Sequence, residues 1–502
     1  MGSTSNPPDL SHHINTKSKS RHPSPLKDII RYMGQDGMIS LAGGLPHPSL
    51  FPLQQAKFDC LPSACLSAGD DGPSDERVSL TLGRGSKPGD LDLTQFLQYG
   101  SGAGNKSLLA LCRALTERVH SPPSEYEVLL HPGNTNAWAK VVGLLCEDND
   151  FVLVEEYTYP SAQALWVPLG VRAVPVCADA GGIDALRLRG VLEGWDDGVR
   201  GSNPTGITIS KERRREIYDV CVEFDIIIVE DDPYYFLQYP PYNPSPALTQ
   251  PQPEKLSPSS FIKSLTPSFL SLDTQGRVIR LESFSKTLFP GLRLGYFITS
   301  PLFSERLLRA TEVETQDPSG LSQAFVLALL ERWGIDGYLA WAQQLRESYR
   351  ERRDWLVGAF YKHFQVRPAR ESPSLPQAEG YVVFLGDKPV FSFIDPGAGM
   401  FVWTKWYFGH VQRFQDIAAL GADEKDPEQA FATELWEAFA SELVLLTPGS
   451  YYHPWQGREK VTTKERGAEE GTAHFRFSFA TPSEEQIVQG VQRIRTVVER
   501  YW

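Results

Sequence analysis

Two short, uninterrupted apolar runs constrain the fold of this chain more than any other feature of its sequence. Residues 151–154 read Phe-Val-Leu-Val and residues 226–229 read Ile-Ile-Ile-Val, and acidic residues follow both runs directly. Apolar runs of this length without polar alternation are typical of strands that are covered on both faces, as in a parallel sheet flanked by helices. We therefore predict an α/β protein with a mostly parallel central sheet.

The segment between these two runs predicts a helix that covers the sheet. Ser210 is a suitable N-cap residue. Apolar residues then follow at i, i+3, i+4 and i+7 on one helical face: Ile217, Val220, Cys221 and Phe224. In open α/β sheets, ligands bind outside the carboxyl ends of the strands. The acidic residues after Val154 and Val229 therefore mark the expected position of the chemistry.

Length and charge limit the classes of protein to consider. At 502 residues the chain is longer than one hydrophobic core usually supports, so we expect two domains. The 62 acidic and 49 basic residues give a net charge of -13, which argues against a nucleic-acid partner and favours small molecules. No apolar run reaches the roughly 18–20 residues of a membrane-spanning helix, so no membrane association is expected.

The N-terminal segment and the cysteines bear on localisation. Residues 1–25 are rich in Ser, His, Pro and Lys, and we predict that they form a disordered tail. The basic residues Lys17, Lys19 and Arg21 are compatible with a mitochondrial leader, but no amphipathic apolar stripe accompanies them. The six cysteines form no CxxC pair and have no metal-ligand spacing, as is typical of reduced thiols. We expect a cytoplasmic protein.

The segment Ser283-Phe-Ser-Lys286, with Arg293 shortly after it, indicates a specific chemistry. The lysine supplies an amine that can form an imine with an aldehyde, while Ser283, Ser285 and the planar guanidinium of Arg293 suit a phosphate group. Pyridoxal 5'-phosphate is a phosphorylated aldehyde that would be held in this way. Taken alone, the segment also fits a solvated lysine in a Ser-rich loop, so the other contacts of the cofactor have to come from elsewhere.

A glycine-led turn before an apolar stretch predicts part of the phosphate site. Gly133 is followed by Asn134 and Thr135, and residues 137–145 have helical character. Free N–H groups and the positive end of the helix dipole favour a phosphate at such a position. A turn with an ordinary helix cap would have the same sequence.

Three further segments predict contacts to the ring of the same cofactor. Asp231, at a strand end, can keep a pyridine nitrogen protonated, and Tyr234 can donate a hydrogen bond to the phenolate oxygen of the ring. The side chain of Asn203, in the turn Asn-Pro-Thr-Gly, can donate to that oxygen as well. Tyr159 is suitably placed to stack on the ring, although a tyrosine beside a proline often only packs.

Taken together and in this order, these segments resemble the fold-type I, pyridoxal-phosphate-dependent aminotransferases of class I/II. The resemblance is strongest to the kynurenine/2-aminoadipate subgroup and to the fungal aromatic amino acid aminotransferases, and it extends from Leu26 to Trp502. The segments that carry it are MISLAGGLP (38–46), LQYG (97–100), NPTG (203–206), EDDPYYFLQY (230–239), SFSK (283–286) and FRFS (475–478).

The resemblance implies further site residues and a homodimer. In the family, the tyrosine that matches Tyr99 contacts the cofactor phosphate of the neighbouring subunit. The arginine that matches Arg476 binds the substrate α-carboxylate, for which a planar fork of donors is suited. The resemblance also implies that Gly44 and Asn203 contact the substrate and that residues 41–46 form a mobile lid.

The same resemblance implies the fold and its domains. We expect the pyridoxal-phosphate-dependent transferase fold of type I, with a large domain around the mostly parallel sheet and a smaller α+β domain. Residues 94–320 are assigned to the large cofactor-binding domain. Residues 26–93 are assigned to the small domain as its N-terminal part, and residues 321–502 as its C-terminal part.

The predicted reaction is transamination by a ping-pong mechanism. Lys286 holds the cofactor as an aldimine until an amino acid displaces it, and the freed amine then moves the proton from the substrate Cα. Aromatic amino acids, kynurenine and 2-aminoadipate are the donors that the resemblance implies, with a 2-oxo acid such as 2-oxoglutarate as acceptor. No residue decides among these donors. A lyase or decarboxylase of the same fold is the alternative.

One segment departs from the family pattern. The family has a buried strand and a short polar turn immediately before the residue that matches Asn203. Here residues 184–195 predict a helix, and only residues 196–202 intervene. We expect either a central sheet that lacks this strand and binds the cofactor weakly, or a sequence that lacks the end of an exon. A catalytically inactive binding protein is then a second alternative.

Overall fold

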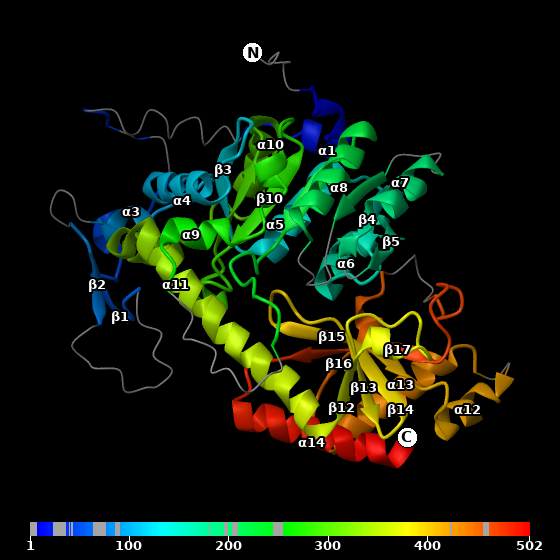
Figure 1. Cartoon of the computed structure of the whole chain (residues 1–502). Coiled ribbons are helices and arrows are strands. Elements are labelled where there is room, and N and C mark those ends of the chain that lie inside the picture. Colours follow the sequence, from blue (N-terminus) through cyan, green and yellow to red (C-terminus); the bar gives the residue numbers. More distant parts are fainter. Residues whose placement is uncertain are drawn as a thin grey trace.

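Two large β-sheets flanked by helices form most of the described part of the protein (Figure 1). The computed structural model describes residues 8–23, 37–39, 41, 44–63, 77–85, 91–179, 181–194, 199–202, 209–243, 255–421, 424–454 and 461–502, with the backbone alone for residues 199–202. No helix within these ranges is both long enough and apolar enough to cross a bilayer.

Within the described ranges, seven strands form the larger sheet. In chain order they are β3 (Glu127–His131), β4 (Phe151–Glu155), β5 (Arg172–Val176), β8 (Val199–Ser202), β9 (Ile228–Asp231), β10 (Val278–Ser283) and β11 (Gly295–Thr299). Across the sheet their order is β3-β11-β10-β9-β8-β4-β5, and only β11 runs antiparallel to its neighbours. The predicted α/β fold with a mostly parallel sheet is confirmed.

Both apolar runs of the sequence lie in this sheet. The first is β4, whose last four residues are buried. The second enters the sheet two residues later than predicted, because pairing with β10 begins at Ile228. The predicted helix between them is α8 (Lys211–Glu223), and the hydroxyl of Ser210 accepts a hydrogen bond from the backbone N–H of Arg213 at 3.2 Å.

Strand β8 corrects the expectation that the central sheet lacks a member. Residues 199–201 pair in parallel with β4 on one side, and Gly201 and Ser202 pair in parallel with β9 on the other. The run Val-Arg-Gly-Ser has no apolar signature, so the sequence pattern did not indicate a strand. Two neighbouring strands with unpaired backbone groups provide its hydrogen bonds and thus select the extended conformation. The predicted helix before it is confirmed as α7 (Ala185–Glu193).

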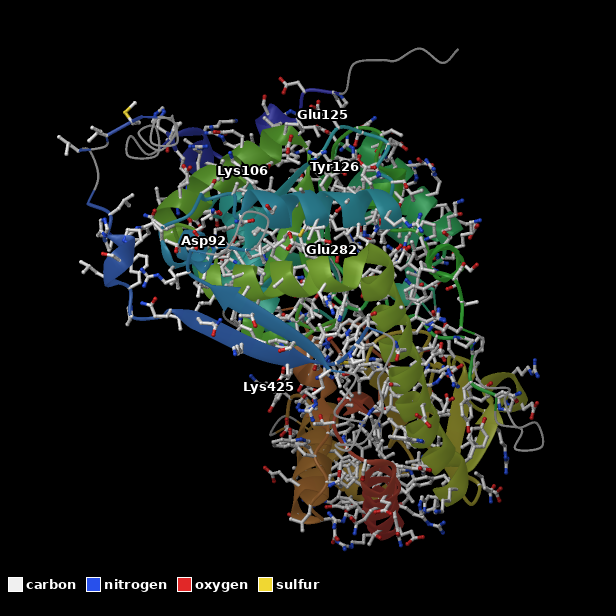
Figure 2. All side chains as sticks on the ribbon, turned by 90° about the vertical axis from the view of Figure 1, so that its left-hand side faces the viewer. Asp92, Lys106, Glu125, Tyr126, Glu282 and Lys425 are labelled. Carbon is white, nitrogen blue, oxygen red and sulfur yellow. The ribbon has the colours of Figure 1, made fainter. Side chains whose placement is uncertain are left out.

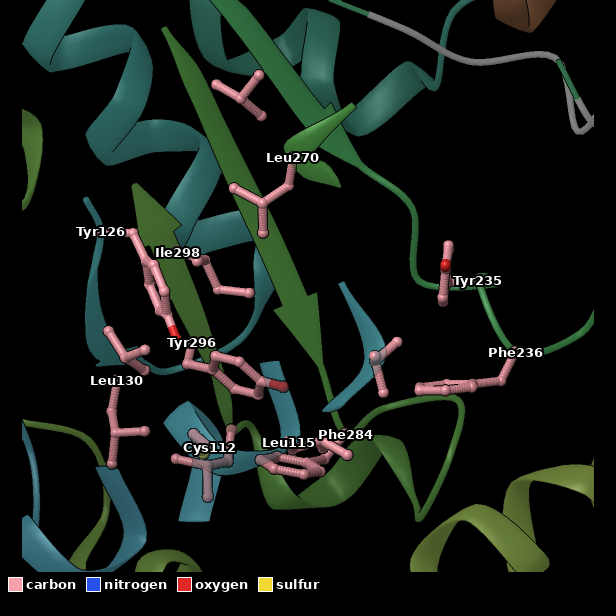
Figure 3. Packing of buried hydrophobic residues seen from close by; sticks show 14 of the residues in the cluster. Cys112, Leu115, Tyr126, Leu130, Tyr235, Phe236, Leu270, Phe284, Tyr296 and Ile298 are labelled. Carbon is pink, nitrogen blue, oxygen red and sulfur yellow. The ribbon is translucent and has the colours of Figure 1, made fainter. Parts of the chain in front are cut away.

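Helices cover both faces of the large sheet. One face packs against α4 (Lys106–Val119), α7, α8, α9 (Pro258–Lys263) and the first part of α11 (Gly320–His363). The other face packs against α5 (Asn134–Leu145), α6 (Pro160–Trp166) and α10 (Pro301–Glu314). Figure 3 shows the first core, where Cys112 and Leu115 of α4 lie near Tyr296 of β11 and Phe284. This double cover explains why the strands are apolar on both faces.

The smaller sheet is antiparallel and has six strands. In chain order they are β12 (Gln365–Pro368), β13 (Tyr381–Leu385), β14 (Lys388–Phe393), β15 (Phe401–Tyr407), β16 (Thr447–Pro448) and β17 (Thr472–Ser478). Its order is β12-β13-β14-β15-β17-β16. The helices of this part are α12 (Gln412–Ala418), α13 (Pro427–Ser441) and α14 (Glu484–Tyr501). They and the second half of α11 share one hydrophobic core with the sheet.

Helix α11 connects the two cores. Its backbone leaves helical geometry at Gly334, where φ is +68°, a value that glycine adopts without strain. Before this kink Val326 and Leu327 pack in the core of the large sheet, whereas Leu356 and Phe360 after it pack in the core of the small sheet. Figure 2 shows α4, which begins at Lys106, beside the first part of α11, and the bend of α11 toward the small sheet.

The N-terminal residues 8–23 contradict the prediction of a disordered tail. They contain the short helix α1 (Thr16–Lys19), and Leu10 and Ile14 are buried against α5. The side-chain amide of Asn15 donates to the carbonyl oxygens of Gly143 (3.0 Å) and Cys146 (2.7 Å) at the end of α5. The backbone N–H of Asn15 also donates to the carbonyl oxygen of Leu144 at 3.0 Å. The last carbonyl groups of a helix have no partner within the helix, and this segment satisfies three of them.

The described part of residues 26–93 also departs from the predicted domain layout. Strands β1 (Gln55–Cys60) and β2 (Val78–Gly83) form a two-stranded antiparallel sheet, followed by α3 (Leu93–Leu97). Leu80 and Leu82 belong to the core of the large sheet, to which the first part of α11 also contributes. Their apolar side chains therefore pack with the large domain, although the resemblance implied the small one. A further short hairpin consists of β6 (Ala178–Asp179) and β7 (Gly182–Ile183).

Candidate active site

A cavity of about 600 Å³ lies between the carboxyl ends of the large-sheet strands and the face of the small sheet. It brings together most of the predicted site residues. Those that line it are Asn134, Thr135, Tyr159, Asp231, Tyr234, Ser283, Ser285, Lys286, Arg293 and Arg476. The acidic ends of β4 and β9 thus mark the site, as the strand pattern predicted.

Asp231, at the end of β9, forms the polar floor of the cavity. Burial is the main reason why the pKa of this carboxyl rises from 3.8 to about 6. The side-chain amide of Asn134 donates to its Oδ1 at 2.6 Å and to the carbonyl oxygen of Leu281 at 3.2 Å. The Asn134 side chain therefore contacts Asp231, whereas the sequence had assigned it to the phosphate. Oδ1 of Asn134 is buried and finds no donor among the described residues.

The turn that begins α5 is shaped for an anion. Gly133 has φ +97° and offers no side chain to cap the helix, so the first N–H groups of α5 remain available. A Cβ atom at Gly133 would collide with the guanidinium of Arg293. That guanidinium is held by the carbonyl oxygens of Pro290 (3.1 Å) and Pro132 (3.4 Å). Glycine here therefore permits an arginine to approach the free end of a helix.

His131, a residue without a distinctive sequence pattern, stabilises this turn through a hydrogen bond. Its Nδ1 accepts a hydrogen bond from the backbone N–H of Gly133 at 3.2 Å. The ring is fully buried, and burial lowers its pKa from 6.5 to about 3, so the imidazole is neutral and can accept. Only the tertiary structure reveals this role, since an isolated histidine at a strand end has no distinctive pattern.

Lys286 lies half-buried after β10, in the turn that the Ser-Phe-Ser-Lys segment predicts. Burial is the main cause that lowers the pKa of its amine, and the positive charge of Arg476 lowers it further. Its Nζ lies 5.8 Å from the ring centroid of Tyr234. Ser283 accepts a hydrogen bond from the backbone N–H of Ser285 at 3.1 Å, which fixes the turn before the lysine.

Two tyrosines of the predicted ring site also face the cavity. Burial raises the pKa of Tyr234 to about 12, so its hydroxyl stays protonated and can donate a hydrogen bond. Tyr159, directly before α6, is about half exposed (49%). An exposed aromatic ring on a cavity wall is available to stack on a flat ligand.

Arg476 projects from β17 on the opposite wall. Its guanidinium lies 3.7 Å from the ring centroid of Phe401 and 4.9 Å from that of Tyr452. Within the described ranges no carboxylate forms an ion pair with it, and its buried Nε has no acceptor. Burial lowers the pKa of this guanidinium, which remains charged. A buried cation without a counter-ion, stacked between aromatic rings, is suited to bind the carboxylate of a ligand.

Two of the predicted site residues that the structure describes do not line this cavity. Tyr99 is exposed (62%), and Gly44 has no other atom within 4 Å of the position that a Cβ would occupy. The segments that carry them meet, because the side chain of Gln98 donates to the carbonyl oxygen of Pro46 at 2.8 Å. Asn203 and part of the predicted lid at 41–46 lie outside the described residues.

The structure adds aromatic residues that the sequence analysis did not find. Tyr157, Phe401, Trp403 and Tyr452 line the cavity next to Arg476. The register of the small sheet pairs Trp403 with Arg476, which places both on the face that looks into the cavity. The period-two spacing of Phe401, Trp403 and Lys405 was visible in the sequence, but not which face of the strand meets the large domain.

Comparisons with known proteins agree on one family. The sequence profile of the family described as aminotransferase class I and II matches residues 90–494. An aromatic amino acid aminotransferase from Schizosaccharomyces pombe is 37% identical over 79% of this chain and 82% of its own length. An L-tyrosine:2-oxoglutarate aminotransferase from Tapinella panuoides is 36% identical over 78% of this chain and 77% of its own length.

A solved structure shows the same fold over the whole chain. The aminotransferase Aro8 from Candida albicans superposes with a TM-score of 0.85 at 32% sequence identity, and the match covers 99% of each chain. The segments that were predicted to resemble such enzymes thus lie in a fold that those enzymes share.

Proposed function

This chain belongs to the aminotransferase class I and II family, and from that premise we propose that it transfers the amino group of an aromatic amino acid to a 2-oxo acid such as 2-oxoglutarate. The convergence of Lys286, Asp231 and Arg476 on one cavity carries this proposal. Two relatives support the aromatic donor and the 2-oxoglutarate acceptor, since one is named an aromatic amino acid aminotransferase and the other an L-tyrosine:2-oxoglutarate aminotransferase. A lyase or decarboxylase of the same fold is not favoured, since the matched proteins are named aminotransferases. An inactive chain is not favoured either, since β8 completes the sheet.

The cavity fits pyridoxal 5'-phosphate, the cofactor on which this family generally depends. When bound, it supplies an aldehyde that condenses with amines and a cationic ring that withdraws electrons from the substrate Cα. Three observations support the fit. A buried carboxyl group lies at the floor, Oδ1 of Asn134 lacks a donor, and the turn at Gly133 leaves helical N–H groups beside the guanidinium of Arg293.

The cavity wall at the carboxyl ends of the large-sheet strands is called the large-sheet wall below. One group of its residues would hold the phosphate of this cofactor, and another group would hold the ring. The phosphate would contact the first N–H groups of α5 at Asn134 and Thr135, the hydroxyls of Ser283 and Ser285, and Arg293. The ring would lie against Tyr159, with its nitrogen at Asp231 and its phenolate oxygen near Tyr234 and Asn203. Because Asn134 donates to Asp231, it also orients the carboxylate that meets the ring nitrogen.

Lys286 supplies the amine that anchors the cofactor and moves the proton. Burial and, to a lesser degree, the charge of Arg476 lower the pKa of this amine, which favours its role as the group that accepts the proton from the substrate Cα. The ring of Tyr234 lies beside the amine, 5.8 Å from Nζ to the ring centroid.

Arg476 orients both substrates in turn. Its planar fork can bind the α-carboxylate of the amino acid and, after product release, that of the 2-oxo acid. Contacts of its guanidinium with the rings of Phe401 and Tyr452 restrict its movement before either substrate arrives. One carboxylate site used by two substrates in succession predicts ping-pong kinetics.

A spectroscopic panel tests the proposed function. Purified protein loaded with pyridoxal phosphate would be offered phenylalanine, tyrosine, tryptophan, kynurenine and 2-aminoadipate one at a time, without an oxo acid. We expect aromatic amino acids to convert the cofactor to its amino form and 2-oxoglutarate to reverse the change, with parallel double-reciprocal lines in steady state. Failure of every amino acid to change the spectrum, or intersecting lines, would contradict the proposal.

We also propose that the protein is a homodimer and that it is located in the cytoplasm. Tyr99 is exposed and lies outside its own cavity, as expected of a residue that serves the site of a second copy. Co-expression of the variants Tyr99→Ala and Lys286→Ala tests this. If Tyr99 acts across subunits, the mixed dimer contains one complete site and activity returns, whereas a residue that acts within its own subunit restores none. Fluorescence microscopy of the tagged chain tests the compartment.

A further inference from the structure

An aromatic wall beside Arg476 extends the active site beyond the residues discussed so far. We propose that Tyr157, Trp403 and Tyr452 form the subsite for the flat side chain of the amino donor, and that His474 behind them is a positioning residue for Trp403. This inference rests on the proposed function, because it names the groups that select the donor of that reaction.

The position of Trp403 follows from strand register. Trp403 on β15 is paired with Arg476 on β17, and residues opposite each other in an antiparallel pair have adjacent side chains. A substrate whose α-carboxylate lies at Arg476 therefore has its remaining groups within reach of the indole. The indole, Tyr157 and Tyr452 all line the same cavity as Lys286.

The rings of this wall contact one another closely. The centroid of Tyr157 lies 4.8 Å from that of Trp403 in a tilted arrangement, and Tyr452 meets Trp403 edge-on at 5.3 Å and 84°. Edge-to-face and tilted contacts at these distances are favourable and hold each ring in one orientation. A preorganised aromatic surface binds a flat, apolar side chain without first having to order itself.

His474 lies two residues before Arg476 on β17 and contacts two residues of this surface. Its ring stacks on Trp403 at 5.5 Å and 17°, and its Nδ1 lies 3.0 Å from the hydroxyl of Tyr157. Burial and the nearby charges of Lys405, His453 and Arg466 lower the pKa of this imidazole well below 6.5, so it is neutral. A neutral Nδ1 can accept the hydrogen bond that Tyr157 donates. His474 itself is not among the residues that line the cavity.

Hydrogen bonds also connect the parts of this aromatic wall that come from the large and the small domain. The backbone N–H of Thr158, next to Tyr157, donates to the carbonyl oxygen of Tyr452 at 2.6 Å. The side chain of Gln163 donates to the carbonyl oxygens of Thr158 (3.0 Å) and Tyr452 (3.3 Å). Tyr157 from the large domain and Tyr452 from the small one are therefore held in a fixed relation, with Trp403 between them.

The charges around the wall favour an uncharged side chain. Lys405 and Arg466 lie behind His474 and do not line the cavity, and Lys405 is paired with Glu469. Of the other described arginines that line the cavity, Arg214 is paired with Glu230 at 2.8 Å and Arg293 is bound to carbonyl oxygens. No described cation is thus free at the wall to pair with a second carboxylate. The wall should select the aromatic donor and have little influence on 2-oxoglutarate.

The kinetics of the two half-reactions in variants of the aromatic wall test whether the wall affects the aromatic donor and not 2-oxoglutarate. We expect Trp403→Leu to lower kcat/KM for phenylalanine about tenfold and to leave the half-reaction of the aminated enzyme with 2-oxoglutarate within about twofold. Tyr451→Leu is the matched control, because Tyr451 is exposed beside Tyr452, does not line the cavity, and should change neither value. Equal losses in both half-reactions of Trp403→Leu would overturn the proposal. Should that variant not fold, Tyr157→Leu, which removes another ring of the wall, serves the same comparison.

A pair of variants at position 474 tests the positioning role. His474→Asn keeps an acceptor near the position of Nδ1, whereas His474→Leu removes it. We expect His474→Leu to raise KM for phenylalanine about fivefold with kcat nearly unchanged, and His474→Asn to restore most of the loss. Identical behaviour of the two variants would overturn the role of His474. If the unmodified enzyme converts no aromatic amino acid, the proposed function itself fails, which is a different outcome from a wall without selectivity.

Discussion

The two walls of the cavity are built in different ways. The large-sheet wall consists of strand ends and the turns after them, and its polar groups already contact one another, as Asn134 contacts Asp231 and Ser285 contacts Ser283. The small-sheet wall consists of alternate residues inside β15 and β17, and Arg476 there has no ion-pair partner among the described residues. The first wall is preorganised for a group that stays bound, and the second is open to ligands that exchange.

Removal of Lys286 should have the largest effect, because it serves both steps. In Lys286→Ala, the amine that anchors the cofactor and the base that moves the Cα proton are lost together. We expect turnover to fall by about 10⁴-fold or more, measured by steady-state assay with an aromatic donor and 2-oxoglutarate. Lys263→Ala, an exposed lysine at the end of α9, is the control and should keep full activity.

Reduction with borohydride, which makes the link between the cofactor and its lysine permanent, tests directly whether that lysine is Lys286. The unmodified protein should yield one labelled peptide, which contains Lys286, and the variant none. A label on any other lysine would contradict the assignment of the large-sheet wall to the cofactor.

Arg476→Lys should separate the two walls. The lysine keeps the charge but loses the bidentate fork, so we expect kcat/KM to fall about a hundredfold for both the amino acid and the oxo acid. The affinity for pyridoxal phosphate, titrated by absorbance, should stay unchanged, because Arg476 lies on the small-sheet wall and is proposed to bind the substrates and not the cofactor. Arg352→Lys, remote from the cavity, is the control. Weakened cofactor binding in Arg476→Lys would break the distinction between the walls.

Asp231→Asn should stabilise the cofactor-free protein in a pH-dependent way. The folded pKa of about 6 lies above the ordinary 3.8, so the folded state resists ionisation and loses stability as the pH rises from about 4 to above 6. The difference corresponds to about 3 kcal/mol at full burial, and contact with the cavity solvent reduces it to about 2 kcal/mol. Urea denaturation should show this gain at pH 8 and none at pH 4.

Two comparisons make the Asp231 prediction sharper. Asp59→Asn, at an exposed position of β1, should change the free energy of unfolding little at either pH. Pyridoxal phosphate should then stabilise the unmodified protein more than Asp231→Asn, since only the carboxylate pairs with a ring cation. A variant that is less stable than the unmodified protein at pH 8 would show that the carboxylate is not strained without its ligand.

Asn15→Ala should give the smallest effect, and one confined to stability. It removes the two hydrogen bonds to the carbonyl oxygens at the end of α5 and the one that Asn15 accepts from the backbone N–H of Ser18. We expect the free energy of unfolding to fall by about 1–2 kcal/mol with kcat unchanged. Ser20→Ala, an exposed neighbour, is the control. Unchanged stability would mean that the N-terminal segment is not held as the structure shows.

Local sequence predicted those parts of the molecule that depend on local physics. Apolar runs followed by acids indicated β4 and β9, a serine before an apolar stripe indicated α8, and Ser-Phe-Ser-Lys indicated the turn at the cavity. These patterns were sufficient because backbone hydrogen bonding and burial on both faces restrict such segments to few conformations. The family resemblance was needed for Arg476, whose own segment looks like an ordinary exposed strand.

Non-local contacts decided the features that the sequence analysis missed. Residues 199–202 are a strand because β4 and β9 offer hydrogen bonds on both sides, although their side chains have no strand pattern. Residues 8–23 are ordered because the end of α5 needs partners for its carbonyl groups. Their composition predicted the opposite, since composition does not record which surface lies nearby.

The sequence by itself determined the class of the fold and the acidic strand ends that line the cavity, and it singled out Lys286 as the proposed reactive residue. Only the tertiary structure decided that Asn134 turns toward Asp231, that His131 supports the turn at Gly133, and that Trp403 faces the same space as Arg476. The physical reason is that strand ends and turns have their geometry fixed by neighbouring residues, whereas the direction of a side chain across a domain boundary depends on how two separately folded sheets pack together.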